Sequence, residues 1–150
     1  MTLKQIGVVW LAVLTLGLGV PRAHADNSKD FGDYVIHYNS LATDVLTPEV
    51  AREYHITRSQ NNAMVNITVL KKVLGSPGQP VHARVEVTAT NLTGQTRKIR
   101  MREVREGNAI YYIGEFGVTN EETVKFSARV LPQGSRDYLK VEFSQDFYTH

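Results

Sequence analysis

The residues of this sequence that could do chemistry are few, and histidine comes first among them. The 150-residue chain has five histidines and no cysteine, which excludes thiolate metal sites, cysteine nucleophiles and disulfides. A zinc or copper site needs three or four ligands that converge, commonly from paired short spacings. His37, His55, His82 and His150 are too widely spaced for such a motif. A metal site would require His37, His55 and a carboxylate to converge over a long range.

Hydrolytic chemistry has equally little support in the sequence. There is no G-x-S-x-G nucleophile motif and no Gly-rich phosphate loop. An acid–base pair of His37 and Asp33 is the basis of an alternative hypothesis, a small hydrolase or metal-dependent enzyme that uses His37 and nearby carboxylates. No catalytic, cofactor-binding or metal-binding residue is assigned, and no cofactor is expected.

The most conspicuous surface feature is a basic run at residues 97–105, RKIRMREVR. If this run is one strand, Lys98, Arg100 and Arg102 share a face at a spacing of about 7 Å. Such a stripe could bind an anionic glycan, a phospholipid headgroup or an acidic protein. The alternative is that the basic residues discourage edge-to-edge strand pairing while nearby glutamates neutralise them.

A second candidate surface lies in residues 31–40, FGDYVIHYNS. Here His37, Tyr38 and Asn39 could form a recognition surface where a strand meets a helix. Alternation along a strand places Tyr38 on the face opposite to His37 and Asn39. The alternative is therefore that the aromatic residues fill one end of a core and the polar groups cap the following loop.

The elements that must position these residues are mostly strands. Patterns typical of half-buried strands occur at residues 34–39, 65–69, 80–91, 98–102, 109–116, 124–130 and 139–143. Polar turns containing Gly, Pro or Asn separate them. Residues 47–54 are predicted to form a short helix, with Thr47 as N-cap and Pro48 at the first position. We expect an all-β protein, an antiparallel β-sandwich of about seven strands with one short helix near the N-terminus.

The N-terminal segment predicts export. Lys4 precedes an uncharged run at residues 6–20, and Ala23 and Ala25 stand at the positions that a signal peptidase reads. The run is shorter than the roughly 20 apolar residues of a spanning helix, although an uncleaved anchor is the alternative. We expect residues 1–25 to be a signal peptide cleaved after Ala25 and residues 26–150 to be a single periplasmic domain that does not span the membrane.

The charge balance limits the partners of this domain. The chain has 17 Lys+Arg and 15 Asp+Glu, but Lys4 and Arg22 belong to the predicted signal peptide, so the mature domain is formally neutral. Neutrality and an extracytoplasmic location argue against nucleic acid. The expected partners are another envelope protein or an anionic envelope component, and a homodimer through an exposed strand is a further alternative.

The sequence also resembles a known family. Residues 30–39, DFGDYVIHYN, followed by residues 46–52, LTPEVAR, and Tyr54 resemble the domain of unknown function 4426 family of small exported proteobacterial proteins. The resemblance extends over essentially the whole mature chain. It implies a periplasmic, immunoglobulin-like β-sandwich and supplies no catalytic residues. The expected function is that of a non-enzymatic binding or protein-interaction module.

Overall fold

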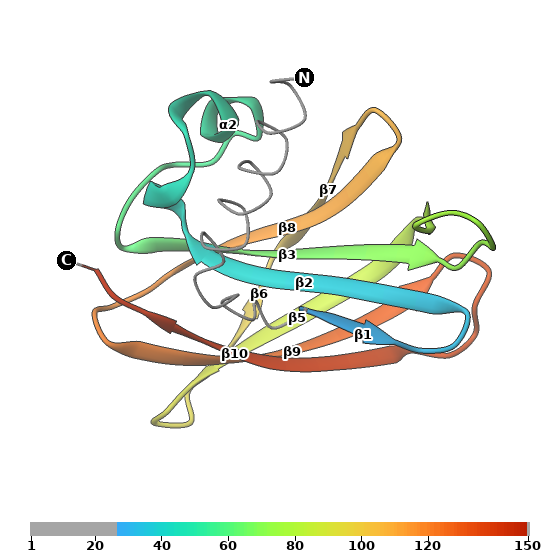
Figure 1. Cartoon of the computed structure of the whole chain (residues 1–150). Coiled ribbons are helices and arrows are strands. Elements are labelled where there is room, and N and C mark those ends of the chain that lie inside the picture. The colour runs from blue at the N-terminus through green and yellow to red at the C-terminus, as the bar shows by residue number, and fades with distance from the viewer. Residues whose placement is uncertain (1–26, 150) are drawn as a thin grey trace, which may run out of the picture.

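The alternation of apolar and polar residues produces two antiparallel sheets packed face to face (Figure 1). The computed structural model describes residues 27–149. The predicted signal peptide, residues 1–25, and His150 therefore lie outside the described residues. The two sheets confirm the predicted β-sandwich. No helix in the described part of the chain is long and apolar enough to cross a membrane.

The first sheet has the strand order β1-β2-β3-β8-β7, and β4 pairs with one end of β3. The bounds of its strands are β1 Ser28–Asp30, β2 Tyr34–Ala42, β3 Asn62–Lys71, β4 Gln79–Pro80, β7 Met101–Glu106 and β8 Ala109–Gly117. The second sheet has the order β10-β9-β5-β6. The bounds of its strands are β5 Ala83–Asn91, β6 Thr96–Ile99, β9 Glu122–Pro132 and β10 Leu139–Phe147.

The strand order is immunoglobulin-like. In an immunoglobulin domain, strands A-B-E-D form one sheet and G-F-C form the other. Here β2-β3-β8-β7 and β10-β9-β5 follow those two orders, and β6 adds a further strand beside β5. The fold implied by the family resemblance is confirmed.

The predicted strand at residues 98–102 is the main departure from expectation. The chain leaves the second sheet after β6 and enters the first sheet at β7, with Arg100 between them. Gly114 on β8 permits this crossing, because a Cβ there would lie 2.5 Å from Ile99 Cγ2 and 2.6 Å from Met101 Sδ. Lys98, Arg100 and Arg102 therefore do not share the face of one strand. With the short strands β1 and β4, this division raises the seven predicted strands to ten in residues 27–149.

The main core lies between the sheets. Inward-facing Val, Ile, Ala and Phe side chains of both sheets fill it, and Phe126 is its largest fully buried member. Phe126 stacks on Phe143 with ring centroids 4.8 Å apart, and Phe143 in turn lies 4.6 Å from Tyr38. Aromatic pairs at these separations add to the stabilisation that burial gives.

A helical excursion between β2 and β3 covers one end of the outer face of the first sheet (Figure 1). It contains a 3-10 turn, η1 Thr43–Val45, and the helix α2 Pro48–Glu53. The side chain of Thr47 accepts a hydrogen bond from the Val50 N–H at 3.3 Å, which confirms the predicted N-cap. A helix of six residues is unstable alone, so its position depends on packing against the sheet.

Two sets of contacts hold this excursion in place. Thr43 is fully buried, and its Oγ1 donates to the Thr57 carbonyl at 2.7 Å and accepts from the Ser59 N–H at 3.0 Å. Beneath the helix, a second small core is formed by Ala51, Ile56, Met64 and Ile113. The first sheet is therefore covered on both faces at this end of the molecule.

Candidate functional site

The three basic residues predicted to form a stripe, Lys98, Arg100 and Arg102, lie in two different parts of the structure. Lys98 and Arg100 line a hollow of about 460 Å³ at the side of the sandwich, together with Glu86. Arg102 lies on the outer face of β7, and its guanidinium donates a hydrogen bond to the carbonyl of Tyr54 at the end of α2. Lys98 and Arg100 are thus brought together, whereas Arg102 fastens the helix to the sheet.

The second predicted surface is also divided. His37 and Asn39 are exposed on the outer face of β2, opposite Thr68 and Asn66 of β3. Tyr38 points the other way, into the main core. Tyr38 therefore contributes to packing between the sheets and does not share a surface with His37 and Asn39.

The described residues contain no metal-binding cluster: nowhere in residues 27–149 do three His, Asp or Glu side chains lie close enough together to hold a metal ion. His37 and His55 do not meet a carboxylate in such a group. His55 instead ends α2 with a φ of 55°, a left-handed conformation common where a helix stops. The long-range convergence required for a metal site is not present among these residues.

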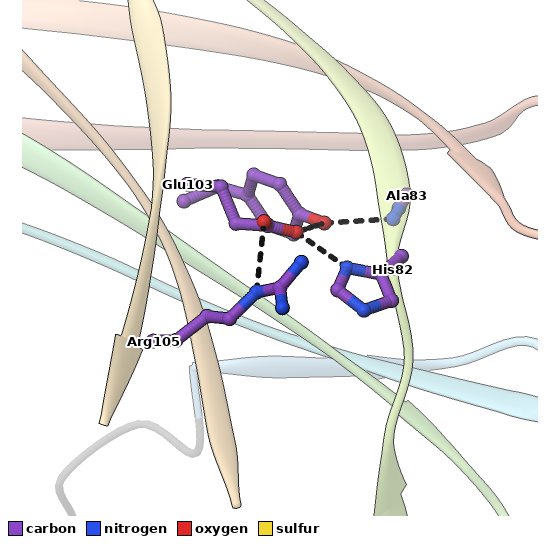
Figure 2. A network of polar contacts seen from close by, with 5 residues as sticks. His82, Ala83, Glu103 and Arg105 are labelled. Atoms are coloured by element: carbon purple, nitrogen blue, oxygen red, sulfur yellow. Dashed lines mark hydrogen bonds and ion pairs between the residues drawn. The ribbon is translucent and has the colours of Figure 1, made fainter. Parts of the chain in front are cut away.

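A polar network joins the two sheets at one side of the sandwich, centred on Glu103 of β7 (Figure 2). Its carboxylate accepts from the Tyr112 hydroxyl at 3.0 Å, and lies 2.6 Å from His82 Nδ1 and 3.2 Å from Arg105 Nε. The hydroxyl of Tyr112 also accepts the N–H of Ala83 at 2.8 Å. One phenol thereby connects β8 of the first sheet with β5 of the second.

The electrostatics of this network favour a charged carboxylate and a neutral phenol. The hydrogen bond from His82 lowers the pKa of Glu103, and the Tyr112 and Arg105 donors act in the same direction. Burial raises the pKa of Tyr112, and its bond to Glu103 raises it further. Each of the groups drawn in Figure 2 has a partner, which is typical of a structural connection between sheets.

A polar cleft of about 810 Å³ lies at one end of the sandwich, between the β5–β6 and β8–β9 loops. Its hydrogen-bonding groups are largely occupied by the loops themselves. Asn91 Oδ1 accepts from the N–H groups of Thr93 and Gln95 at 3.1 and 2.9 Å, and Glu122 Oε2 accepts from the Thr119 N–H at 2.8 Å. These side chains stabilise turns, as Asn and Asp commonly do.

A third hollow differs from both, because it is mostly apolar. It lies between α2 and the outer face of the first sheet and has a volume of about 250 Å³. We call it the α2 groove. Its lining consists of Asn39, Leu41, Leu46, Val50, Tyr54, Ile56, Met64, Asn66, Tyr111 and Ile113. The lining contains no Asp, Glu, His, Lys or Arg, and most of its side chains are aliphatic or aromatic.

Tyr54 fixes the helical wall of the α2 groove to β7. Its hydroxyl donates to Glu106 and its carbonyl accepts from Arg102. The hydrogen bond to Glu106 is the main reason why the pKa of Tyr54 rises to about 12. The raised pKa favours the neutral form of the phenol at neutral pH.

Asn66 is the exceptional residue of the α2 groove. It alternates on β3 with the buried Val65 and Ile67, so its side chain points to the outer face of the sheet. Among the described residues, its Oδ1 is the one buried side-chain oxygen or nitrogen that has no hydrogen-bond partner. Asn62 lies on the same face of the strand, and its Nδ2 donates to the Thr57 carbonyl at 3.0 Å and to the Glu115 carboxylate at 2.8 Å.

A family model described as a domain of unknown function (DUF4426) matches residues 28–150. The chain belongs to the DUF4426 family. A crystal structure of a DUF4426 protein from Pseudomonas aeruginosa PAO1 is 29% identical, with a TM-score of 0.69, and the match covers 82% of this chain and 94% of that one. The match confirms the family and the fold. No curated protein sequence matches the chain.

More distant structures share the fold alone. FetP of uropathogenic Escherichia coli strain F11, expressed in the periplasm, is 8% identical with a TM-score of 0.58, covering 82% of this chain and 93% of FetP. A copper-bound FetP variant is 9% identical with the same TM-score, covering 84% and 97%. At this identity the copper belongs to the description of FetP only.

Sequence reasoning did not find the α2 groove or the Glu103 network. A signal for the groove was present in the apolar residues at outward-facing positions, Leu41 and Met64, which show that another element covers this part of the sheet. Tyr112 had no comparable signal, because its partners come from segments 9 and 29 residues away.

Proposed function

We propose that this DUF4426 protein is an exported, non-enzymatic binding module of the periplasm, and that the α2 groove holds its ligand. The observation that carries the proposal is a mostly apolar hollow lined by Asn66, whose side-chain oxygen is buried and has no partner among the described residues. Buried polar groups in folded proteins nearly always have partners, so an exception calls for an explanation. A ligand that enters the groove explains it.

The size and lining of the groove favour a small ligand. Pockets for drug-sized molecules measure about 300–1,000 Å³, and the α2 groove, at about 250 Å³, is just below that range. An ionised ligand would lose its hydration without meeting an opposite charge on the walls, which is unfavourable. A neutral, mainly apolar molecule is the best match.

The proposal that the protein is exported rests on its N-terminal sequence. The uncharged run at residues 6–20 and the small residues Ala23 and Ala25 have the layout of a cleavable signal. Expression of the full chain in a Gram-negative host is expected to give a periplasmic protein whose first residue is Asp26. Mass spectrometry of the periplasmic fraction measures this directly. An intact N-terminus in the cytoplasmic fraction would contradict the proposed location.

Binding in the groove is tested with toluene, a small apolar probe, and backbone amide chemical shifts. The groove-lining amides are expected to shift in a saturable way. Val50→Phe fills the groove from its helical wall and is expected to abolish the response. Val45→Phe is the matched control, because Val45 is 67% exposed and does not line the groove. Absence of saturable shifts at millimolar toluene, or an equal response in both variants, would refute the groove as the site.

A further inference from the structure

From the position of Asn66, we infer that the ligand of the α2 groove is a small neutral molecule with an apolar body and one N–H or O–H donor, which binds the Asn66 side-chain oxygen. This inference rests on the proposed function and specifies its ligand class. A groove lined only by apolar groups would select ligands by size and shape. The amide adds a requirement for one directed hydrogen bond.

The hydrogen-bonding capacity of the groove is unevenly used. Tyr54 already donates its hydroxyl proton to Glu106. Asn39 is exposed at the rim and can exchange hydrogen bonds with water. Asn66 Oδ1 is shielded from water and has no partner among the described residues. A ligand donor therefore gains most at Asn66, because that oxygen has no hydrogen bond to give up when the ligand binds.

Access to Asn66 Oδ1 requires a small movement of the groove lining, because the oxygen is covered in the empty groove. Met64 is the neighbour on the same face of β3, two residues away, and it also lines the groove. A methionine side chain has three rotatable bonds and repacks easily. We therefore expect the Met64 side chain to adjust when a ligand enters the groove.

The volume sets the size of the ligand. Since one water occupies about 30 Å³ in the liquid, the groove has room for roughly eight to ten non-hydrogen atoms. A single fused aromatic ring pair is of this size. The donor is expected to be neutral, since no carboxylate lines the groove to balance an ammonium group.

Indole and benzofuran are matched probes for this inference. The two ring systems have the same size, but indole has an N–H where benzofuran has an oxygen. The only tryptophan of the full sequence is Trp10, in the predicted signal peptide. Indole fluorescence can therefore be followed without a tryptophan background in a chain that starts at Asp26, which contains both sheets and both cores.

Indole is expected to bind with a dissociation constant between about 10 µM and 1 mM. Benzofuran, measured by its displacement of indole, is expected to bind about five- to tenfold more weakly, the effect of one hydrogen bond. Asn66→Leu is expected to remove this difference. Thr68→Val, on the same face of β3 outside the groove, is the control and is expected to retain it.

The outcomes separate the inference from the proposed function. Equal affinities for the two rings in the unaltered protein would overturn the donor requirement and leave an apolar binding site. Failure of both rings to bind at millimolar concentration would overturn both proposals. A preference for indole that persists in Asn66→Leu would place the donor contact elsewhere and overturn the assignment to Asn66.

Discussion

The Glu103 network and the α2 groove lie on different sides of the same sheet and differ in whether their polar groups have hydrogen-bond partners. In the network, one carboxylate has three side-chain partners, and the phenol of Tyr112 connects it to the second sheet. In the groove, the Oδ1 of Asn66 is buried without a partner. The hydrogen bonds of the network connect the two sheets, whereas the Asn66 oxygen in the groove makes no contact that would stabilise the fold.

This difference separates a structural polar cluster from the proposed binding site. A buried donor or acceptor without a partner costs about 1–3 kcal/mol. A fold that retains such a group departs from local consistency, and departures of this kind are expected at functional sites. Removal of a polar group from the network should therefore destabilise the protein, and removal of the Asn66 amide from the groove should stabilise it.

The largest effect is expected for Tyr112→Phe in the network. The substitution leaves the Ala83 N–H without its acceptor and removes a donor from Glu103. The free energy of unfolding is expected to fall by about 1–3 kcal/mol, measured by urea denaturation. Tyr111→Phe is the matched control on the opposite face of β8, with an expected change within about 0.5 kcal/mol. Equal effects of the two substitutions would contradict the structural assignment of Tyr112.

An increase in the free energy of unfolding is expected for Asn66→Leu in the groove. An apolar side chain of similar size removes the unpartnered oxygen, so the free energy of unfolding is expected to rise by about 1 kcal/mol and the melting temperature by about 3–5 °C. Asn39→Leu, its exposed cross-strand neighbour, is expected to change stability by no more than about 0.5 kcal/mol. A clear loss of stability in Asn66→Leu alone would show that this amide serves the fold.

The pH dependence of stability provides a smaller test of the network. The pKa of Glu103 is lowered in the folded state, first by His82, so the unfolded state binds its proton more readily. The stabilisation is present above the ordinary glutamate pKa of 4.5 and is lost as the pH falls through the lower, folded value.

Glu103→Gln is therefore expected to reduce the decline in stability below pH 4.5, by about 1 kcal/mol or less because the side chain is 30% exposed. Asp30 and Glu142 also have lowered pKa values, caused mainly by Lys72 and Lys140. Their contribution is common to both proteins and cancels in the difference. Parallel acid-denaturation curves would mean that Glu103 gains no stabilisation from its partners.

The smallest effect on global stability is expected for Tyr54→Phe at the groove wall. The Tyr54 hydroxyl donates a hydrogen bond to the exposed Glu106. Loss of this hydroxyl is expected to lower the free energy of unfolding by about 0.5 kcal/mol or less. The effect is local: faster hydrogen exchange is expected at the Ala51 and Tyr54 amides, which bond to Thr47 and Val50 within the helical turn. Unchanged exchange at these amides would show that the Tyr54 hydroxyl does not help to hold α2.

The local features of the fold could be predicted from the sequence. Alternation identified the long strands, and Thr47 with Pro48 marked the start of α2. The passage from β6 to β7 could not be predicted, because alternation continues unchanged when a chain moves from one sheet to the other. A close approach to Gly114, fifteen residues beyond Ile99, determines where the change occurs.

The candidate site was less accessible to sequence reasoning for a related reason. Asn66 lies in a predicted strand between apolar residues, where a polar side chain is normally solvated. The groove that it lines is formed partly by α2, which begins 18 residues earlier and whose packing is a tertiary property. His37 and Lys98 were conspicuous by type, but neither lines the groove.

The most direct test of the α2 groove as a ligand site is the side-chain amide resonance of Asn66 during titration with indole. Asn62, on the same strand but outside the groove, donates both Nδ2 protons to Thr57 and Glu115 and serves as the internal reference. A saturable shift of the Asn66 side-chain signal is expected, with the signal of Asn62 unmoved. An Asn66 signal that stays in place while indole saturates another part of the protein would contradict this expectation.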